Sequence, residues 1–185
     1  MNNALQFRRA TLTDAEGLNQ LVNSAYRGDS SRKGWTTEAD LLDGQRIDVN
    51  FLREMINHPN TVILLAERCL EHSDGGTAPR VLIGSVQLEK KAEDGCYLGM
   101  FTVRPDLQGS GIGKIFMSEA EAWVRKNWHS KWIEMTVITL RKELIAFYER
   151  RGYQFTGEVR PFHHDERFGI QKRSGIELGV WRKSL

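Results

Sequence analysis

The sequence predicts a protein of the α/β (α+β) class, with one mixed β-sheet and helices packed against it. Two patterns along the 185-residue chain lead to this expectation. Residues 61–103 contain β-rich apolar runs separated by turn residues, which indicates consecutive antiparallel strands. After Pro105 an amphipathic helix is followed by another strand, which is typical of a parallel crossover. The two arrangements together define a mixed sheet.

The N-terminal third predicts one strand followed by three helices. Thr13 and Glu16 have the spacing of a capping box, and apolar residues behind them recur with the period of a helix that ends near Tyr26. Pro59 sets the end of the third helix, because the residue before a proline disfavours helical geometry. In chain order we expect a strand at residues 5–10, the first helix, a loop at 27–31, a second helix from Thr36 or Thr37 to Leu42, and a third at 49–57.

The rest of the chain predicts six strands and two helices. Apolar residues from Ile112 onward form a stripe on a helix of about 16 residues. A second helix, over residues 140–151, ends at Gly152, because glycine readily takes the left-handed conformation that follows a helix. Loops are expected at residues 71–79 and 160–175. The predicted strands are residues 61–68, 81–89, 96–103, 132–137, 153–159 and 176–181.

The composition excludes several classes of protein. The longest apolar run, residues 62–66, is far shorter than the roughly 20 residues of a membrane-spanning helix. The net charge of +2 comes from interleaved acidic and basic residues, so we expect no nucleic-acid partner. Cys69 and Cys96 do not make a disulfide framework, and residues 1–9 do not resemble a secretory leader. We therefore expect a single domain over residues 1–185, located in the cytoplasm without membrane attachment.

The strongest functional signal lies between the strand that ends at Val103 and the helix that begins near Ile112. Gly109, Gly111 and Gly113 follow one another at every second position there. Glycines at the start of a helix let a ligand approach the backbone closely. The free N–H groups and the helix dipole then favour a phosphate.

Two common phosphate-binding patterns do not fit this segment. A P-loop requires a glycine and a serine or threonine where the chain has Gln108 and Ile115. A dinucleotide fingerprint that starts at Gly109 requires its third glycine where the chain has Lys114. The pattern that fits is [Arg/Gln]-x-x-Gly-x-[Gly/Ala], where x is any residue.

Gln108, Gly111 and Gly113 satisfy that pattern, and a second motif, Phe-Tyr-Glu-Arg-Arg-Gly-Tyr, follows at residues 147–153. With both motifs in this order, the chain resembles the GNAT superfamily of acetyl-coenzyme A-dependent N-acetyltransferases. The resemblance implies a GNAT-like fold, in which a central, mostly antiparallel twisted sheet is flanked by helices. It also implies a cleft between the strands at residues 96–103 and 132–137.

The resemblance further implies that acetyl-coenzyme A is the co-substrate and that no metal takes part. In the family, backbone amides of the glycine-rich loop bind the pyrophosphate, and the pantetheine arm pairs with the preceding strand. Tyr148 corresponds to the general acid that protonates the departing thiolate, while an aromatic residue that only fills the interface is the alternative. The implied cofactor-binding residues are Phe101, Thr102, Val103, Gln108, Gly109, Ser110, Gly111, Ile112, Gly113 and Lys114.

The general base is left open by the sequence. Asp94 lies close to a position where several family members have a glutamate. Glu38 and Asp40 belong to the N-terminal region that lines the acceptor side in the family, although a carboxylate in a first helical turn also serves the helix dipole alone. Arg141 stands where the family often has an asparagine, so the contacts of that asparagine are not transferred to this chain.

The implied reaction is direct attack of a primary amine on the acetyl thioester in a ternary complex, because neither motif contains a cysteine. The acceptor is a small-molecule or peptide amine, and its identity and the oligomeric state are left open. The acidic residues between positions 29 and 48 are offset by basic ones. A non-catalytic acyl-CoA-binding sensor or interaction module is the alternative function.

Two other groups of residues invite a functional interpretation. Tyr26 and Trp35 are expected either to line the acceptor pocket or to pack short helices together. Residues 163–166, His-His-Asp-Glu, have the composition of a metal site. Adjacent residues on one loop rarely converge on a single ion, so we expect no metal there.

Overall fold

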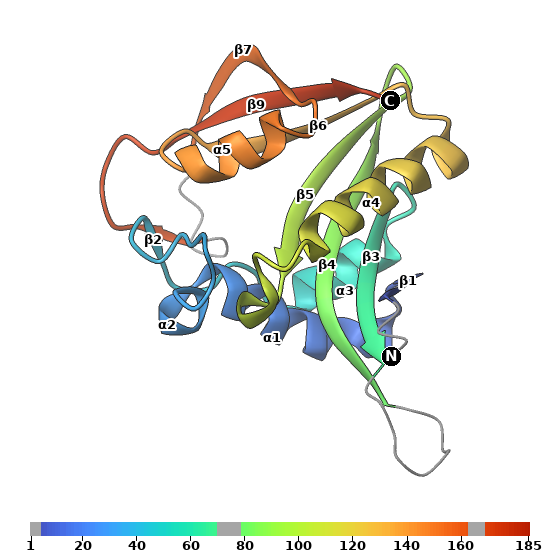
Figure 1. Ribbon diagram of the computed structural model, residues 1–185, viewed down its shortest axis with the longest axis horizontal. Coiled ribbons are helices and arrows are strands. Elements are labelled where there is room, and N and C mark those ends of the chain that lie inside the picture. Colours follow the sequence, from blue (N-terminus) through green and yellow to red (C-terminus); the bar gives the residue numbers. More distant parts are fainter. Residues whose placement is uncertain (1–4, 70–78, 163–168) are drawn as a thin grey trace.

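Seven strands form one twisted sheet in the order β1-β3-β4-β5-β6-β9-β7 (Figure 1). The structure is a computed structural model that describes residues 5–69, 79–162 and 169–185. All neighbouring strands in this sheet are antiparallel except β5 and β6, which run parallel. The predicted mixed, mostly antiparallel sheet is confirmed. The strands are β1 (Leu5–Arg9), β2 (Leu42–Asp43), β3 (Thr61–Cys69), β4 (Arg80–Lys91), β5 (Gly95–Val103), β6 (Trp132–Ile138), β7 (Gln154–Pro161), β8 (Ile170–Gln171) and β9 (Glu177–Ser184).

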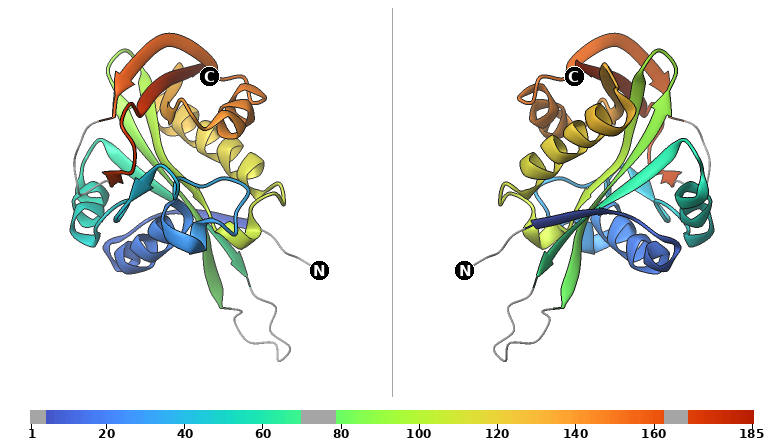
Figure 2. Two further views of the ribbon diagram at one scale, coloured as in Figure 1. Left: turned by 90° about the vertical axis from the view of Figure 1, so that its left-hand side faces the viewer. Right: turned by 90° about the vertical axis from the view of Figure 1, so that its right-hand side faces the viewer.

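Helices cover both faces of this sheet (Figure 2). On one face α1 and α3 pack through buried residues such as Leu18 and Leu52. On the other face α4 and α5 pack through residues such as Phe116 and Ile145. The helices are α1 (Ala15–Tyr26), α2 (Gly28–Ser31), α3 (Val49–Asn57), α4 (Ile112–Trp128) and α5 (Lys142–Glu149), with short 3-10 turns η1 (Leu12–Asp14) and η2 (Pro105–Leu107).

Phe116 is at the centre of the α4 side of the core. Its ring lies 5.5 Å from that of Phe7 on β1 and 5.6 Å from that of Phe101 on β5, measured between centroids. The side chain is completely buried, which contributes about 1.5–3 kcal/mol to stability. The apolar stripe predicted for residues 112–124 therefore holds the glycine-rich loop in place at the start of α4.

The first helix begins differently from the prediction. The capping box uses Thr11 and Asp14 rather than Thr13 and Glu16: the backbone N–H of Thr11 donates to the Asp14 carboxylate at 2.8 Å. Arg8 also donates to both oxygens of Asp14 at 2.8 Å. The 3-10 turn η1 lies between this capping box and the start of α1. The predicted end of the helix at Tyr26 is confirmed.

The predicted helix from Thr36 or Thr37 to Leu42 is wrong. This segment makes a single turn, in which the backbone N–H groups of Leu41 and Leu42 both donate to the carbonyl of Glu38 at 2.9 Å, and it then enters β2. The Thr37 hydroxyl accepts from the N–H of Ala39 at 3.1 Å, a local bond that competes with helix formation. The segment predicted as a loop before it contains the short helix α2.

The segment at residues 160–175, predicted as a loop, contains the short strand β8, which pairs with β2. Most of the loop predicted at residues 71–79, and the His-His-Asp-Glu run at 163–166, lie outside the described residues. The second predicted helix of the C-terminal half starts at Lys142 instead of Leu140. Within the described part of the chain, no helix is both long and apolar enough to cross a membrane.

Candidate active site

The parallel strands β5 and β6 separate after a short paired stretch. Residues 95–97 pair with residues 132–134, and β5 then continues to Val103 without a partner on this side. Just beyond the last pair, the hydroxyl groups of Tyr97 and Thr136 are 2.9 Å apart and share a hydrogen bond across the gap. The predicted cleft between these two strands is confirmed. An unpaired strand edge leaves N–H and C=O groups free for a ligand.

A β-bulge turns β5 at the cleft. Two residues of β5, Met100 and Phe101, lie opposite one residue of β4, and Met100 has a left-handed φ of 46°. A bulge changes the direction in which side chains point. Met100 accordingly packs with α1 and α3, whereas Phe101 contacts Phe116 on the opposite face. Nothing in the sequence pattern predicted this bulge.

The glycine-rich loop has the open geometry that a bound phosphate requires. Gly109 and Gly111 have left-handed φ values of 79° and 88°, and a Cβ atom at either position would have no atom within 4 Å. Gln108 closes the base of the loop, because its side-chain amide donates to the Val103 carbonyl at 3.0 Å. The N–H groups of residues 109–113 have no hydrogen-bond partner within the described residues, so they are available to an anion.

A cavity of about 300 Å³ opens between this loop and α5, and we call it the loop-side cavity. Its charged residues, as far as the chain is described, are all basic: Lys114, Arg141, Arg150 and Arg151. Phe101, Thr102 and Val103 form its floor along the free edge of β5. Free N–H groups, open space above the glycines and basic side chains all suit the pyrophosphate of coenzyme A.

A second cavity, of about 380 Å³, lies against β5, β6 and α3, and we call it the strand-side cavity. Most of its lining is apolar, with polar groups from residues such as Gln87, Tyr97 and Thr136. The two cavities share part of their walls. The residues that line both are Tyr26, Phe101, Arg141, Leu144 and Tyr148.

Tyr148 lies on α5 at this shared wall. Its side chain is buried, and burial raises the pKa of its hydroxyl far above the usual range. Its ring contacts Phe147 and Tyr153 in edge-to-face geometry. Among the described residues its hydroxyl has no hydrogen-bond partner, in contrast to that of Tyr26, which donates to the Phe101 carbonyl at 2.9 Å. Tyr148 therefore holds its proton at neutral pH and can donate it to a ligand at the junction.

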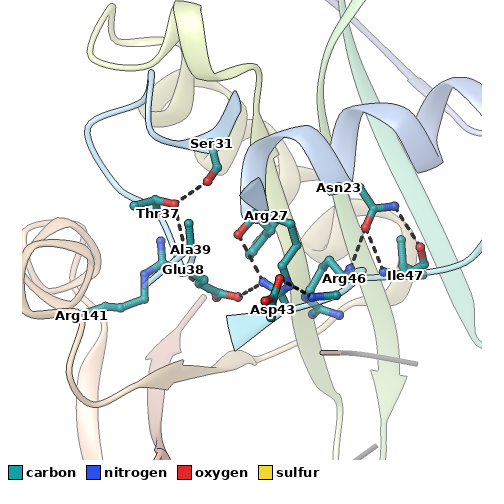
Figure 3. A network of polar contacts seen from close by, with 12 residues as sticks. Asn23, Arg27, Ser31, Thr37, Glu38, Ala39, Asp43, Arg46, Ile47 and Arg141 are labelled. Carbon is teal, nitrogen blue, oxygen red and sulfur yellow. Dashed lines mark hydrogen bonds and ion pairs between the residues drawn. The ribbon is translucent and has the colours of Figure 1, made fainter. Parts of the chain in front are cut away.

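Glu38 occupies the centre of a polar network beside the junction (Figure 3). Its two carboxylate oxygens accept from Arg27 at 2.6 Å and from Arg141 at 2.7 Å, and all three side chains are buried. Burial alone would raise the pKa of Glu38, but Arg141, Arg27 and Arg46 together outweigh it and hold the pKa below its usual value. Arg141 also donates to the Thr36 hydroxyl at 2.7 Å. Arg141, which stands where the family often has an asparagine, therefore connects the start of α5 to the segment around Glu38.

The other two predicted base candidates lie away from both cavities. Asp40 is exposed and pairs with Arg32 at 2.6 Å. Asp94 is in the turn before β5, where it pairs with Lys131 at 2.8 Å. Asp94 thus stands at the end of β5 where β6 is still paired, opposite the end that opens into the cleft. Glu38 is the single base candidate that the structure brings to the junction with Tyr148.

Most of the predicted cofactor-binding residues line the loop-side cavity. Ser110 and Ile112 do not, since the Ser110 hydroxyl turns back to the Leu107 carbonyl and Ile112 enters the core. Trp35, predicted at the acceptor pocket, lines the loop-side cavity and packs against Phe147. Sequence reasoning missed Arg46, Tyr97 and Thr136 of the strand-side cavity, because no local motif marks them.

The described residues contain no group of three His, Cys, Asp or Glu side chains placed to hold a metal ion. Both cysteines are free. Cys96 is buried in the core, and this burial raises the pKa of its thiol to about 12. Neither cysteine lines a cavity described above.

Comparisons with known proteins identify the family and the fold of the chain. The sequence matches the profile of the Acetyltransferase (GNAT) family over residues 22–153. A search of curated protein sequences gave no match. Among solved structures, spermidine N-acetyltransferase from Vibrio cholerae in complex with CoA and spermine has 17% identity and a TM-score of 0.66, over 97% of this chain and 95% of that one.

Two further structures have the same fold. PaiA N-acetyltransferase from Thermoplasma acidophilum, in complex with coenzyme A, has 15% identity and a TM-score of 0.62, over 98% of this chain and 99% of that one. An acetyltransferase assigned to the GNAT family, from Desulfovibrio desulfuricans, has 19% identity and a TM-score of 0.66, over 98% of this chain and 99% of that one.

The family match spans well over half of the chain, so the protein belongs to the GNAT family of acetyltransferases. It is an N-acetyltransferase that uses acetyl-coenzyme A. The resemblance read from the two sequence motifs is confirmed.

Proposed function

We propose that the protein transfers the acetyl group of acetyl-coenzyme A to the primary amine of a small molecule, by direct attack in a ternary complex. The observation that carries this proposal is the wall that the two cavities share. Coenzyme A enters the loop-side cavity and the acceptor enters the strand-side cavity, so the thioester and the amine meet between Phe101 and Tyr148. A cavity of about 380 Å³ is of a size that suits a small molecule.

The loop provides the binding energy for the cofactor. The N–H groups of residues 109–113 and the N-terminus of α4 bind the pyrophosphate, with Lys114, Arg150 and Arg151 nearby. The amides of the pantetheine arm add to the edge of β5 at Phe101, Thr102 and Val103, which has no strand partner on this side. The carbonyls of Phe101 and Val103 already accept from Tyr26 and Gln108, so the arm binds mainly to backbone N–H groups there. This arrangement directs the thioester toward the shared wall.

The reaction needs one nucleophile and one proton donor. The neutral amine nitrogen attacks the acetyl carbonyl carbon, the C–S bond breaks, and the departing thiolate takes the proton of Tyr148. The product nitrogen loses its extra proton to solvent, from which Tyr148 is reprotonated. Burial that raises the pKa of Tyr148 also raises the proton affinity of a thiolate in the same cleft, so proton transfer between them remains matched.

A covalent acetyl-cysteine route has no support in this arrangement. Cys96 is buried away from both cavities and its thiol has a pKa of about 12, so it holds almost no thiolate at neutral pH. Cys69 lies on β3, which contributes to neither cavity. The free state of both cysteines also supports the cytoplasmic location proposed for the protein.

The test is initial-velocity kinetics with a panel of amines, following release of the coenzyme A thiol. Direct transfer predicts intersecting double-reciprocal lines, and intact-mass measurement after incubation with acetyl-coenzyme A alone should show no acetylated protein. Parallel lines together with an acetyl-enzyme would contradict the mechanism. Coenzyme A binding without thiol release for any cationic, neutral or anionic amine would favour the non-catalytic alternative.

A further inference from the structure

The charged residues of the strand-side cavity are unusual for a protein that binds an amine. Within the described residues its lining has three arginines, Arg27, Arg46 and Arg141, and one carboxylate, Glu38. Both oxygens of that carboxylate are already bound, by Arg27 and Arg141. The described lining therefore has an excess of positive charge and no carboxylate left for a cationic substrate.

Arg46 differs from the other two arginines of this set in that it forms no ion pair within the described residues. No carboxylate of the described residues is within ion-pair distance of its guanidinium, which instead lies over the ring of Tyr26, 5.4 Å from the centroid. The side chain is half-buried. A partly desolvated guanidinium is costly to leave without an anion, and its planar fork matches a carboxylate.

The backbone of Arg46 is fixed to α1 by Asn23 (Figure 3). The side-chain oxygen of Asn23 accepts from the N–H of Arg46 at 2.6 Å, and its amide donates to the Ile47 carbonyl at 2.9 Å. Tyr26 is on the same helix, and its hydroxyl bonds to Phe101 at the junction. Arg46 is thus held one aromatic ring away from the place where the amine meets the thioester.

The acidic residues near this cavity do not offset Arg46. Asp48 accepts from the N–H of Phe51 as the N-cap of α3, and Asp40 pairs with Arg32. Asp43 accepts from the N–H of Gly44 and is exposed. None of the three lines the cavity. Acidic and basic residues offset each other in the sequence of the acceptor side, but the fold keeps these three acids out of the cavity and places Arg46 in its lining.

We propose that the acceptor is an amine that also carries a carboxylate, such as an α-amino acid with an apolar side chain, and that Arg46 binds the carboxylate. This proposal rests on the proposed function and names its substrate class. The apolar majority of the lining accommodates the side chain, Arg46 receives the carboxylate, and the amine points to Tyr148. A polyamine would instead place ammonium groups among arginines, where like charges repel.

The experiment compares L-leucine with L-leucinamide, which lacks the carboxylate charge, and with spermidine. The variants are Arg46→Gln, Arg46→Lys and the control Arg53→Gln, which removes an exposed arginine of α3 that pairs with Glu16 outside the cavity. The readout is the ratio of kcat/KM for leucine to that for leucinamide. Because every variant receives the same amines at the same pH, differences in amine basicity cancel between variants.

With each kcat/KM expressed per neutral amine, because leucinamide is less basic than leucine, the wild type is expected to prefer leucine. Arg46→Gln should lower the preference ratio about 10–100-fold, the effect of losing a hydrogen-bonded charge pair. Arg46→Lys should retain part of the preference, and Arg53→Gln all of it. Preference of the wild type for leucinamide or spermidine on this per-neutral-amine basis would overturn the proposal, and so would an unchanged ratio in an Arg46→Gln variant with a wild-type melting temperature.

Binding separates this proposal from the proposed function. Calorimetric titration of N-acetyl-L-leucine into the protein saturated with coenzyme A should show an affinity that falls about 10–100-fold in Arg46→Gln. If no amine is acetylated but this loss is seen, the proposed function fails while carboxylate recognition stands. If the titration shows no binding, or equal binding by both proteins, carboxylate recognition by Arg46 is refuted.

Discussion

Replacing Glu38 by glutamine tests the buried network that links three distant segments of the chain. The Glu38 carboxylate forms an ion pair with Arg27, which directly follows α1, at 2.6 Å. It forms a second ion pair with Arg141, which precedes α5, at 2.7 Å. The side chains of all three residues are at most 9% exposed. The substitution keeps the shape of the side chain but leaves two buried guanidinium groups facing a neutral amide.

The expected loss of stability follows from this burial. Removing one partner of a buried ion pair costs about 3–5 kcal/mol, because the remaining charge stays desolvated. For a chain of this length, that corresponds to a fall in melting temperature of about 6–20 °C. The matched control is Asp40→Asn, which breaks a pair of equal length, 2.6 Å to Arg32, at the surface. Solvent and salt screen that pair, so its loss should leave stability unchanged.

Urea unfolding followed by tryptophan fluorescence measures both variants. The pKa of Glu38 is lowered in the folded protein, so its contribution is complete above the ordinary value of about 4.5 and is lost as the pH falls below it. The difference between wild type and Glu38→Gln should therefore shrink at acidic pH. Equal stability of Glu38→Gln and Asp40→Asn at pH 7 would refute the reasoning that burial makes this network strong.

Two further predictions concern the junction and the loop. Tyr148→Phe should lower kcat by about 10²–10⁴-fold, with the affinity for acetyl-coenzyme A unchanged by calorimetry, and an unchanged kcat would remove the general-acid role. Gly111→Ala should destabilise the protein by about 1–2 kcal/mol, because its φ of 88° is left-handed, and should weaken cofactor binding, because the added Cβ enters the open space above the loop that the pyrophosphate occupies. Gly111→Glu should in addition abolish binding through its charge, and full activity of this variant would refute the loop assignment.

The long periodic elements of the fold could be predicted from the sequence, but the segment around Glu38 could not. Strands such as β3 and helices such as α3 have an apolar pattern that burial enforces over a whole element. Residues 36–42 have a composition typical of a helix, but Glu38 forms ion pairs with arginines that are 11 and 103 positions away in the sequence. Local sequence cannot predict these contacts. The two-residue strands β2 and β8 are too short to show any period.

The site divides in the same way. The glycine-rich loop and Tyr148 belong to local motifs whose chemistry is fixed by spacing, so the sequence indicates them directly. Arg46 has no motif, and its position depends on Asn23, which is 23 residues away, and on the ring of Tyr26. The bulge at Met100 is equally invisible in the sequence, since a left-handed φ is unusual for this residue type.

The proton of the acceptor amine gives the last test of the arrangement. Within the described residues, Glu38 is the one carboxylate in the strand-side cavity, and two ion pairs and a lowered pKa make it a weak base. The amine should then react from its own neutral fraction, so kcat/KM should rise with pH until the pKa of the acceptor. For acceptors of different basicity, this rising limb of the pH profile should shift along the pH axis by the difference in their pKa values. A limb that stays at one pH for all acceptors would show that a group of the protein takes the proton, and loss of that limb in Glu38→Gln would identify Glu38 as the group.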